Sequence, residues 1–469
     1  MTLAFADTHA NAHAPSIGGS TGTTGTRLPA VAGAELNVPL VTGQWVPYAN
    51  LDNAASAPCL NAARDAVNEL LPYYASVHRG AGWASQVSTA VYERARAVVR
   101  RFVGGYHRDA VVFTRNTTDA LNLLARAVPR GTSVVLFDTD HHAALLPWRG
   151  PRVRRIATPP SPQAAISELD AALRDAPVGP RLVVITGASN VTGELWPVAE
   201  LAAVARQHGA RTVLDAAQLA PHRAVDAYRH GLDYVALSGH KLYAPFGVGA
   251  LVGRADWLQA AEPYLAGGGA SRWVVDWGDH LAVSWAAAPE RHEAGSPNVV
   301  GAHALAAACT ALADCGWDAI AAHEDTLLRR LRAGLATVPG LRELSLFGAD
   351  HPRVGVVSVA VDGHDPGLLA AALSAEHGIG VRDGAFCAHL ATRRLLGCVS
   401  SGAGTTASTA LRASIGLGST AEHVDRLVAA LRALVTDGPR WRYAQVDGRW
   451  LPDPDPRPVP PVLSATHAS

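Results

Sequence analysis

The 469-residue chain has no net charge and no long apolar run, and each absence excludes a class of function. Basic and acidic residues balance at 40 each, so no overall charge would attract nucleic acid or an anionic membrane. No uninterrupted run of about 18 apolar residues occurs, which argues against a membrane-spanning helix. The first residues, MTLAFADTHANAH, lack a basic segment followed by an apolar block and make a poor secretory signal.

Cysteine is also scarce, and the number and spacing of the cysteines indicate a reducing compartment. The five cysteines are odd in number and irregularly spaced: Cys59, Cys309, Cys315, Cys387 and Cys398. Such a set is typical of reduced thiols rather than of a disulfide framework. We therefore expect a cytoplasmic protein.

Lysine is the scarcest of the basic residues. Lys241 is the only lysine among 40 basic residues, and all the others are arginine. A genome rich in GC codons explains the excess of arginine but not why one lysine remains. Arginine can serve in ion pairs, whereas an amine that must lose its proton and form an imine has to be lysine. The count alone therefore makes Lys241 a candidate for a chemical role.

Apolar residues are plentiful at 48%, and their pattern predicts an α/β fold. Short apolar runs alternate with amphipathic helical segments, as in buried parallel strands spaced by helices. The predicted strands are residues 110–113, 133–137, 182–186, 212–214 and 234–237, and the predicted helices are 88–102, 117–127 and 198–208.

The pattern changes after about residue 300, which divides the chain into four parts. Residues 1–40 form a flexible arm, 41–300 a large domain, 301–440 a smaller α+β domain and 441–469 an extended Pro-rich tail. In the smaller domain we expect helices at 300–315, 319–337, 366–377 and 421–435, with strands at 355–361 and 380–382.

Polar residues follow several of the predicted strands, where α/β sheets bind their ligands. Asp215 would either hold a positive charge, such as a protonated ring nitrogen, or cap the next helix. Asn190 is either a turn residue or a hydrogen-bond donor to a ligand. Ser238 and His240 flank a glycine directly before Lys241, and both could bind an anion such as phosphate.

Two adjacent histidines, His141 and His142, suggest a metal site, but the sequence argues against one. No HExxH, CxxC or comparable ligand spacing accompanies them. An imidazole over a flat ring, or a core histidine, fits better, and we predict no metal. Dinucleotide and P-loop signatures are also missing.

Cys387 and Arg412 each have two interpretations. Cys387 is either a small buried apolar residue or, in its loop after Gly384, an activated thiol with Cys398 as a possible resolving partner. Arg412 would either clamp a substrate carboxylate or form an ordinary ion pair.

Together these elements resemble one family, the class V branch of the fold-type I pyridoxal-phosphate enzymes. Within it the chain most resembles the sulfur-mobilising cysteine desulfurases and the selenocysteine lyases. The resemblance rests on LDNAASAP (51–58), SVHRG (76–80), RNTTDALNL (115–123), DHHAALLPW (140–148), ASNVTG (188–193), SGHKLYAPFGVG (238–249), HEAGSPN (292–298), RDGAFCAH (382–389) and LRAS (411–414). It implies a large domain with a mostly parallel, seven-stranded sheet between helices, and a smaller α+β domain.

The resemblance also implies roles for individual residues. Lys241 would hold pyridoxal 5'-phosphate as a Schiff base and then move the proton at the substrate's α-carbon, while Asp215 would keep the ring nitrogen protonated. His141 would stack on the ring and serve in acid–base chemistry. The remaining cofactor ligands would be Asn190 and Gln218 at the phenolic oxygen, Thr117, Thr118, Ser238 and His240 at the phosphate, and Ser296 from the other subunit of a dimer. Arg412, Ala55 and Asn190 would bind the amino acid.

Cys387 matches the nucleophile of the family, which takes sulfur from L-cysteine as a persulfide and leaves L-alanine. We therefore expect a cytoplasmic, homodimeric cysteine desulfurase whose persulfide passes sulfur either to an acceptor protein or into a biosynthetic pathway. The alternatives are another class V activity (C–S lyase, selenocysteine lyase, epimerase or aminotransferase) or a non-catalytic scaffold for sulfur carriers. Two departures stand out: the nucleophile follows GAF, where polar residues or histidine are expected, and the segment 271–285 carries three tryptophans that could reshape the substrate entrance.

Overall fold

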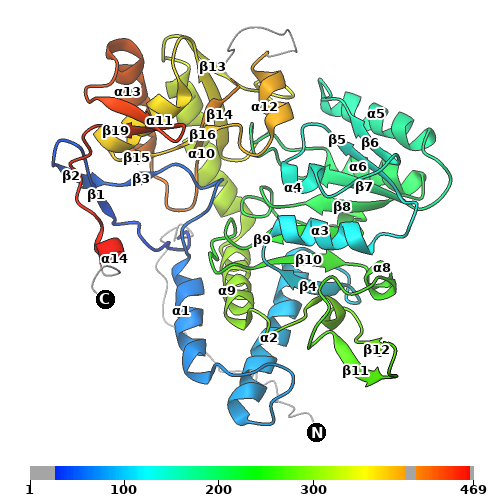
Figure 1. Ribbon diagram of the computed structural model, residues 1–469. Coiled ribbons are helices and arrows are strands. Elements are labelled where there is room, and N and C mark those ends of the chain that lie inside the picture. The colour runs from blue at the N-terminus through cyan, green and yellow to red at the C-terminus, as the bar shows by residue number, and fades with distance from the viewer. Residues whose placement is uncertain (1–26, 398–407, 465–469) are drawn as a thin grey trace, which may run out of the picture.

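The computed structural model describes residues 27–397 and 408–464, and its largest sheet has seven strands (Figure 1). The strand order is β4-β10-β9-β8-β7-β5-β6. The neighbours from β9 to β6 are parallel, and β10 is antiparallel to both β9 and β4. The strands are β4 (Ala110–Thr114), β5 (Ser133–Phe137), β6 (Val153–Ile156), β7 (Arg181–Thr186), β8 (Arg211–Asp215), β9 (Tyr234–Ser238) and β10 (Gly249–Gly253). The predicted mostly parallel sheet is confirmed.

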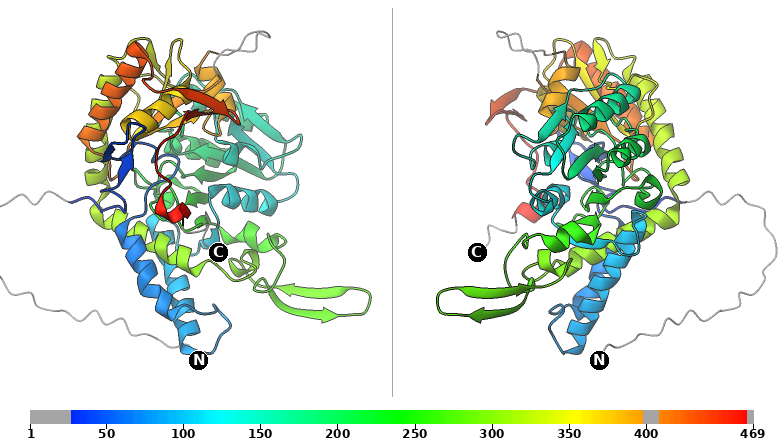
Figure 2. Two further views of the ribbon diagram at one scale, coloured as in Figure 1. Left: turned by 60° about the vertical axis from the view of Figure 1, so that its left-hand side comes forward. Right: turned by 90° about the vertical axis from the view of Figure 1, so that its right-hand side faces the viewer.

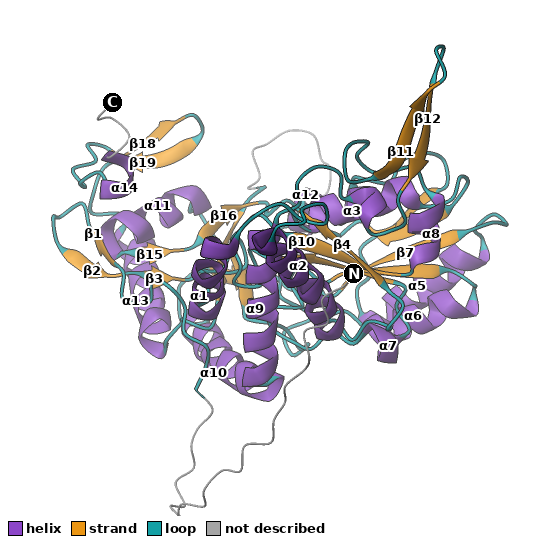
Figure 3. Ribbon diagram, turned by 90° about the horizontal axis from the view of Figure 1, so that it is seen from below, coloured by secondary structure: helices purple, strands orange, loops and turns teal. Residues whose placement is uncertain are grey.

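Helices cover both faces of this sheet, which explains why its central strands are continuously apolar. In β5, Val135 and Phe137 belong to one core cluster, with α5 (Pro162–Arg174) and α6 (Val198–Gln207). Val134 and Leu136 point the other way, into the cluster that contains α3 (Thr117–Ala127). Figure 3 shows α3 and α8 (Ala255–Ala260) on one side of the sheet and α5, α6 and α7 (Ala227–His230) on the other. A strand that is buried on both faces is apolar at consecutive positions along its middle.

Three long helices pack together beside the sheet. They are α1 (Asn61–Leu70), α2 (Trp83–Phe102) and α9 (Val299–Cys315), and α9 contacts both of the others. After α9 the chain turns by 82° into α10 (Trp317–Leu335). In the described residues no single helix has the length and apolar character to cross a membrane, although the bent pair of α9 and α10 meets that criterion by length and composition alone.

A second, four-stranded antiparallel sheet has the order β13-β14-β17-β16. Its strands are β13 (Leu341–Glu343), β14 (Val356–Val361), β16 (Arg382–Gly384) and β17 (Ala410–Ser414). Its core includes side chains of α10, α11 (Pro366–His377) and α13 (Ala421–Asp437). The strand expected at 380–382 is in fact two short strands, because β15 (Ile379–Gly380) pairs with β3 (Ala49–Asn50) while β16 pairs with β17.

The arm and the tail are more structured than their compositions indicate. Residues 37–39 form β1 (Asn37–Pro39), which pairs with β2 (Trp45–Pro47), and Val31 and Leu40 are buried. The rest of the predicted arm, residues 1–26, lies outside the described residues. The predicted extended tail begins with a hairpin of β18 (Tyr443–Val446) and β19 (Arg449–Pro452) against α11, followed by α14 (Pro461–Ser464). The hairpin forms because Asp447-Gly448 takes positive φ at both residues, as a tight two-residue turn requires.

The Trp-rich segment is a hairpin of β11 (Ser271–Asp276) and β12 (Leu281–Trp285). It projects from the body of the molecule in Figure 2, and Trp273, Trp277 and Leu281 are exposed. The remaining elements are short: η1 (Leu71–Tyr73), α4 (His142–Leu145), α7 (Ala227–His230), α8 (Ala255–Ala260), η2 (Glu290–His292) and α12 (His389–Leu395).

Candidate active site

A cavity of about 540 Å³ opens where β7, β8 and β9 end. The last residues of these strands, Thr186, Asp215 and Ser238, all line it. It also collects the other predicted site residues except Ser296: Ala55, Thr117, Thr118, His141, Asn190, Gln218, His240, Lys241, Cys387 and Arg412. The Trp-rich hairpin is not among its lining residues, so within this chain that hairpin does not reshape the entrance.

Lys241 lies three residues beyond the end of β9, and its amine is poised to react. Its Nζ lies 3.4 Å from Oε1 of Gln218. Burial, and then the positive charge of Arg412, lower the pKa of Lys241 from 10.5 to about 8, although Asp215 and Cys387 act in the opposite direction. A substantial fraction of this amine is therefore neutral near pH 7.5, as a nucleophile that attacks a carbonyl must be.

Asp215 is buried at the end of β8 and accepts a hydrogen bond from the Ala217 backbone amide at 3.0 Å. Burial raises the pKa of Asp215, against the effects of that amide and of Lys241. The helix-cap interpretation is wrong, because the next helix in the described chain is α7, which Asp226 caps. A buried carboxylate with one hydrogen bond fits a cationic N–H partner in the cavity.

The start of α3 supplies an anion site on another wall. Asn116 caps this helix by accepting from the Asp119 amide at 3.0 Å. The Ser238 hydroxyl accepts from the Thr117 amide at 2.9 Å and donates to the Thr117 hydroxyl at 2.8 Å. At Gly249 a Cβ would lie 2.6 Å from the Asn116 Cα, so only glycine lets β10 approach this turn. With Thr118 and His240 also lining the cavity, the site has the donors and the helix terminus that bind a phosphate.

The two adjacent histidines take separate directions. His141 Nδ1 accepts from the Ala143 amide at 3.0 Å, which leaves the proton on Nε2. Burial, and then Lys241, lower the pKa of His141 to about 3, so its ring is neutral. His142 instead pairs with His389, with 3.1 Å between Nε2 and Nδ1 and stacked rings 4.8 Å apart. Within the described part of the chain, no group of three or more His, Cys, Asp or Glu side chains could hold a metal ion.

Cys387 lies in the loop between β16 and α12, and its side chain is exposed rather than buried as a small apolar residue. Phe386 and Cys387 both have φ of 53°, a left-handed conformation that costs free energy for residues other than glycine. Two hydrogen bonds hold the loop in place. Asn190 donates to the Phe386 carbonyl at 2.7 Å, and the His142 amide donates to the Cys387 carbonyl at 2.8 Å. Asn190 is thus more than a turn residue, while Cys398 lies outside the described residues.

Arg412 is buried on β17, and only part of its hydrogen-bonding capacity is used. It donates to the Asn190 carbonyl at 2.9 Å and to Asp52 at 3.3 Å, and its guanidinium carbon lies 4.9 Å from the centre of the Phe386 ring. Among the residues that the structure describes, its Nε has no hydrogen-bond partner. Burial lowers its pKa, although Asp52 opposes this. A buried guanidinium with an unmet donor fits a carboxylate ligand.

Several further side chains, to which the sequence assigns no individual role, lie in the cavity wall or next to it. Arg382 and His389 line the cavity, and both flank Cys387 closely enough in sequence to have been considered. Asp140 is buried and accepts from the Thr186 hydroxyl at 2.8 Å. Burial raises the pKa of Asp140 to about 7, and Asp215 adds to the effect.

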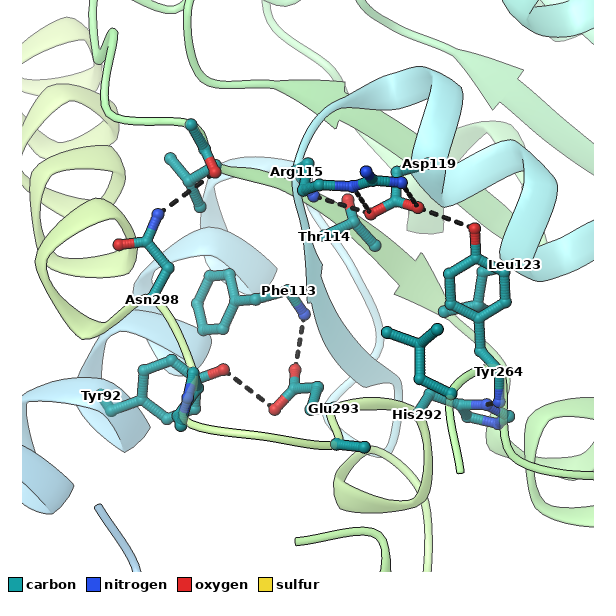
Figure 4. Close-up of a pocket in the computed structure, with 15 residues that line it drawn as sticks. Tyr92, Phe113, Thr114, Arg115, Asp119, Leu123, Tyr264, His292, Glu293 and Asn298 are labelled. Carbon is teal, nitrogen blue, oxygen red and sulfur yellow. Dashed lines mark hydrogen bonds and ion pairs between the residues drawn. The ribbon is translucent and has the colours of Figure 1, made fainter. Parts of the chain in front are cut away.

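The HEAGSPN motif lines a different cavity, of about 330 Å³, between β4, α3 and residues 292–298 (Figure 4). Both carboxylate oxygens of Glu293 accept two hydrogen bonds there. It accepts from Arg96 at 2.6 and 2.8 Å, from the Tyr92 hydroxyl at 2.9 Å and from the Phe113 amide at 2.6 Å. Such a carboxylate holds α2, β4 and the motif together and has little capacity left for chemistry. Ser296 is exposed in this segment, and its expected service to another subunit stays a prediction.

Comparison with known proteins gives a consistent set of relatives. The model of the family described as aminotransferase class-V matches residues 49–427. A cysteine desulfurase of Dickeya dadantii is 36% identical over 406 residues, covering 84% of this chain and 93% of the relative. A probable cysteine desulfurase of Aeropyrum pernix is 37% identical over 351 residues, 72% of this chain and 85% of the relative.

Solved structures agree with these relatives. The apo structure of a cysteine desulfurase from Thermococcus onnurineus NA1 matches with a TM-score of 0.73 and 31% identity, covering 83% of this chain and 95% of that one. The cysteine desulfurase CsdA of Escherichia coli, in an S-sulfonic acid form, matches with a TM-score of 0.69 and 30% identity over 82% and 94% of the two chains. The fold-type I prediction is confirmed.

Proposed function

The chain belongs to the class-V aminotransferase family, and on that premise we propose that it is a cysteine desulfurase that converts L-cysteine to L-alanine. The observation that carries the proposal is that Cys387 and Lys241 line one cavity, the first as an exposed thiol and the second as an amine of lowered pKa. The similarity to named cysteine desulfurases over most of the chain supports the same substrate.

Members of this family depend on pyridoxal 5'-phosphate, and the residues present fit that group. When bound, the cofactor supplies an electron sink for the substrate's α-carbon. Asp215 would hold the protonated ring nitrogen, and the turn before α3 with Ser238 and His240 would hold the phosphate. Asn190 and Gln218 would serve the phenolic oxygen, and the neutral His141 would stack on the ring.

The chain's own residues would divide the work on the substrate. Arg412 would bind the carboxylate beside Ala55 and Asn190. Lys241 would then move the proton at the α-carbon. The Cys387 thiolate would attack the substrate's sulfur, so that an S–S bond forms and the C–S bond breaks. The electron pair of the broken bond would return to carbon, which takes up a proton to give alanine.

The proton of Cys387 needs an acceptor, and the sequence GAF before the cysteine offers none. His389, two residues after Cys387, lines the same cavity and stacks on His142 at the start of α4. We assign to this pair the role of receiving that proton. The persulfide would then pass its outer sulfur to the thiol of an acceptor protein in the cytoplasm.

A homodimer is part of the proposal. Ser296 is exposed on the motif that would reach a second subunit, and the β11–β12 hairpin exposes apolar side chains that a second copy would cover.

The test is an assay of the purified protein with pyridoxal 5'-phosphate, L-cysteine and a reductant. Equal amounts of alanine and sulfide are expected. Cys387→Ala should abolish this product pair, whereas Cys59→Ala, a control outside the cavity, should retain it. Pyruvate with ammonia in place of alanine would mean β-elimination, and alanine formation that survives Cys387→Ala would refute the assigned nucleophile.

A further inference from the structure

A buried chain of hydrogen bonds leads from Lys241 away from the cavity. Gln218 Oε1 lies 3.4 Å from Lys241 Nζ, and its Nε2 lies 3.3 Å from His222 Nε2. His222 Nδ1 in turn contacts Glu324 Oε2. His222 and Glu324 are 5% and 3% exposed and do not line the active-site cavity, so none of the roles above uses them.

The direction of each hydrogen bond can be worked out from Glu324. Its Oε1 accepts from Arg223 Nη1 at 2.7 Å, and its Oε2 faces His222. Although burial raises the pKa of Glu324, His222 and Arg223 together hold it below the ordinary value, so the group is an ionised acceptor. His222 must therefore carry a proton on Nδ1, and because Gln218 places its Nε2, which can only donate, at His222 Nε2, that second ring nitrogen is an acceptor. Gln218 then turns its NH₂ to His222 and its carbonyl oxygen to Lys241.

We propose that His222 and Glu324 are positioning residues, which fix the Gln218 amide with its oxygen toward Lys241 and thereby set how readily the Lys241 nitrogen loses its proton. The importance of that proton rests on the proposed function, because the cofactor would be carried on this nitrogen. The orientation itself requires no cofactor. A carbonyl oxygen stabilises an ammonium group, whereas an NH₂ in its place would destabilise it.

We call the hydrogen-bonded series Lys241–Gln218–His222–Glu324 the relay. It links two parts of the molecule that are distant in sequence. His222 follows β8, and Glu324 lies on α10, about a hundred residues further along the chain. The other charged or titratable groups around the pair are Arg223, Asp325, His323 and Tyr243, and those around Lys241 are Asp215, Cys387, His141, His240 and Arg412. Gln218 is the side chain that hydrogen-bonds on both sides.

Glu324→Gln is the most informative variant. It keeps the shape of the side chain and should reverse the direction of each hydrogen bond from residue 324 to Lys241. Arg223 can only donate, so the new amide would give it the oxygen and turn its NH₂ to His222. The His222 proton would move to Nε2, and Gln218 would turn its NH₂ to Lys241. We expect the pKa of Lys241 to fall by about one pH unit.

The measurement exploits the single lysine. Competitive labelling of the full-length, cofactor-free protein with an amine reagent at a series of pH values gives one pKa, read from the peptide that contains Lys241. His222→Leu should lower it by a smaller amount, since the amide is then free to turn, and His222→Gln should restore it by offering Gln218 a carbonyl. Asp325→Asn removes a neighbouring ion pair with Arg223 and leaves the relay intact, so it should titrate like wild type.

A second readout on the loaded enzyme is the pH midpoint of the cofactor's visible band, which should move with the same variants. Folded Glu324→Gln and His222→Leu proteins that titrate like wild type in both measurements would overturn the proposal. Since labelling needs no cofactor, that result is independent of whether wild-type protein turns over cysteine. If Glu324→Gln fails to fold, His222→Leu and His222→Gln decide the question as a pair.

Discussion

The lowered pKa of Lys241 predicts how the cofactor-free protein takes up pyridoxal 5'-phosphate. Only a neutral amine attacks the cofactor's aldehyde, so the rate should follow the deprotonated fraction. With a pKa of about 8, roughly a quarter of the amine is neutral at pH 7.5, against roughly one part in a thousand for the ordinary value of 10.5. The structure thus gives an advantage of roughly two hundredfold at this pH.

The assay is stopped-flow absorbance of cofactor binding between pH 6 and 10, with a free alkylamine in parallel to correct for titration of the cofactor itself. The rate should level off just above pH 8. Arg412→Gln removes a positive charge that lowers the Lys241 pKa, so it should move the midpoint upward. Arg330→Gln, on an exposed ion pair of the smaller sheet's helices, should leave it in place. A wild-type rate that still rises tenfold per pH unit above pH 9.5 would refute the reasoning.

Three other perturbations follow from the geometry. Glu293→Gln breaks the buried ion pair with Arg96 and should lower the free energy of unfolding in urea by about 3–5 kcal/mol. Asp425→Asn, at an exposed ion pair, should lower it by less than about 1 kcal/mol. Equal losses would contradict the argument from burial. Gly249→Ala drives a Cβ to 2.6 Å from the Asn116 Cα and should weaken cofactor binding by roughly tenfold in equilibrium dialysis, while Gly82→Ala, which has open space, should not. His389→Phe keeps a ring against His142 but removes the imidazole of His389, so the rate of sulfide release should fall by about a hundredfold with the cofactor spectrum unchanged. His364→Phe should leave the rate of sulfide release unchanged. A normal rate in His389→Phe would contradict the role assigned to the imidazole pair.

The sequence predicts five of the seven strands of the large sheet and misses β6 and β10. Strands β5, β7, β8 and β9 are apolar at consecutive positions because helices cover both of their faces, and that pattern is visible in one dimension. The border strand β6 has two exposed arginines at its centre, so its apolar signal is weak. Strand β10 begins and ends with glycine, which argues against a strand until its close contact with Asn116 is seen.

The same limit applies to the site. Residues at strand ends, such as Asp215 and Ser238, could be located because the fold itself brings strand ends together. Glu324 could not, because it reaches His222 only through the packing of α10. Nor could the pairing of His142 with His389, which are 247 positions apart and meet because the Cys387 loop folds back onto the His142 amide.

The rate at which a protease cleaves the projecting β11–β12 hairpin should depend on whether a second copy of the chain covers it. Arg272 is exposed on its first strand, and no other lysine or arginine follows before Arg291. Trypsin should therefore cut an uncovered hairpin at one defined bond, and the new chain end after Arg272 identifies that cut. A second copy that covers the exposed tryptophans would shield that bond, so the rate of nicking should fall as the protein concentration rises. Limited digestion across a dilution series would then report the dissociation constant of the proposed dimer without any label.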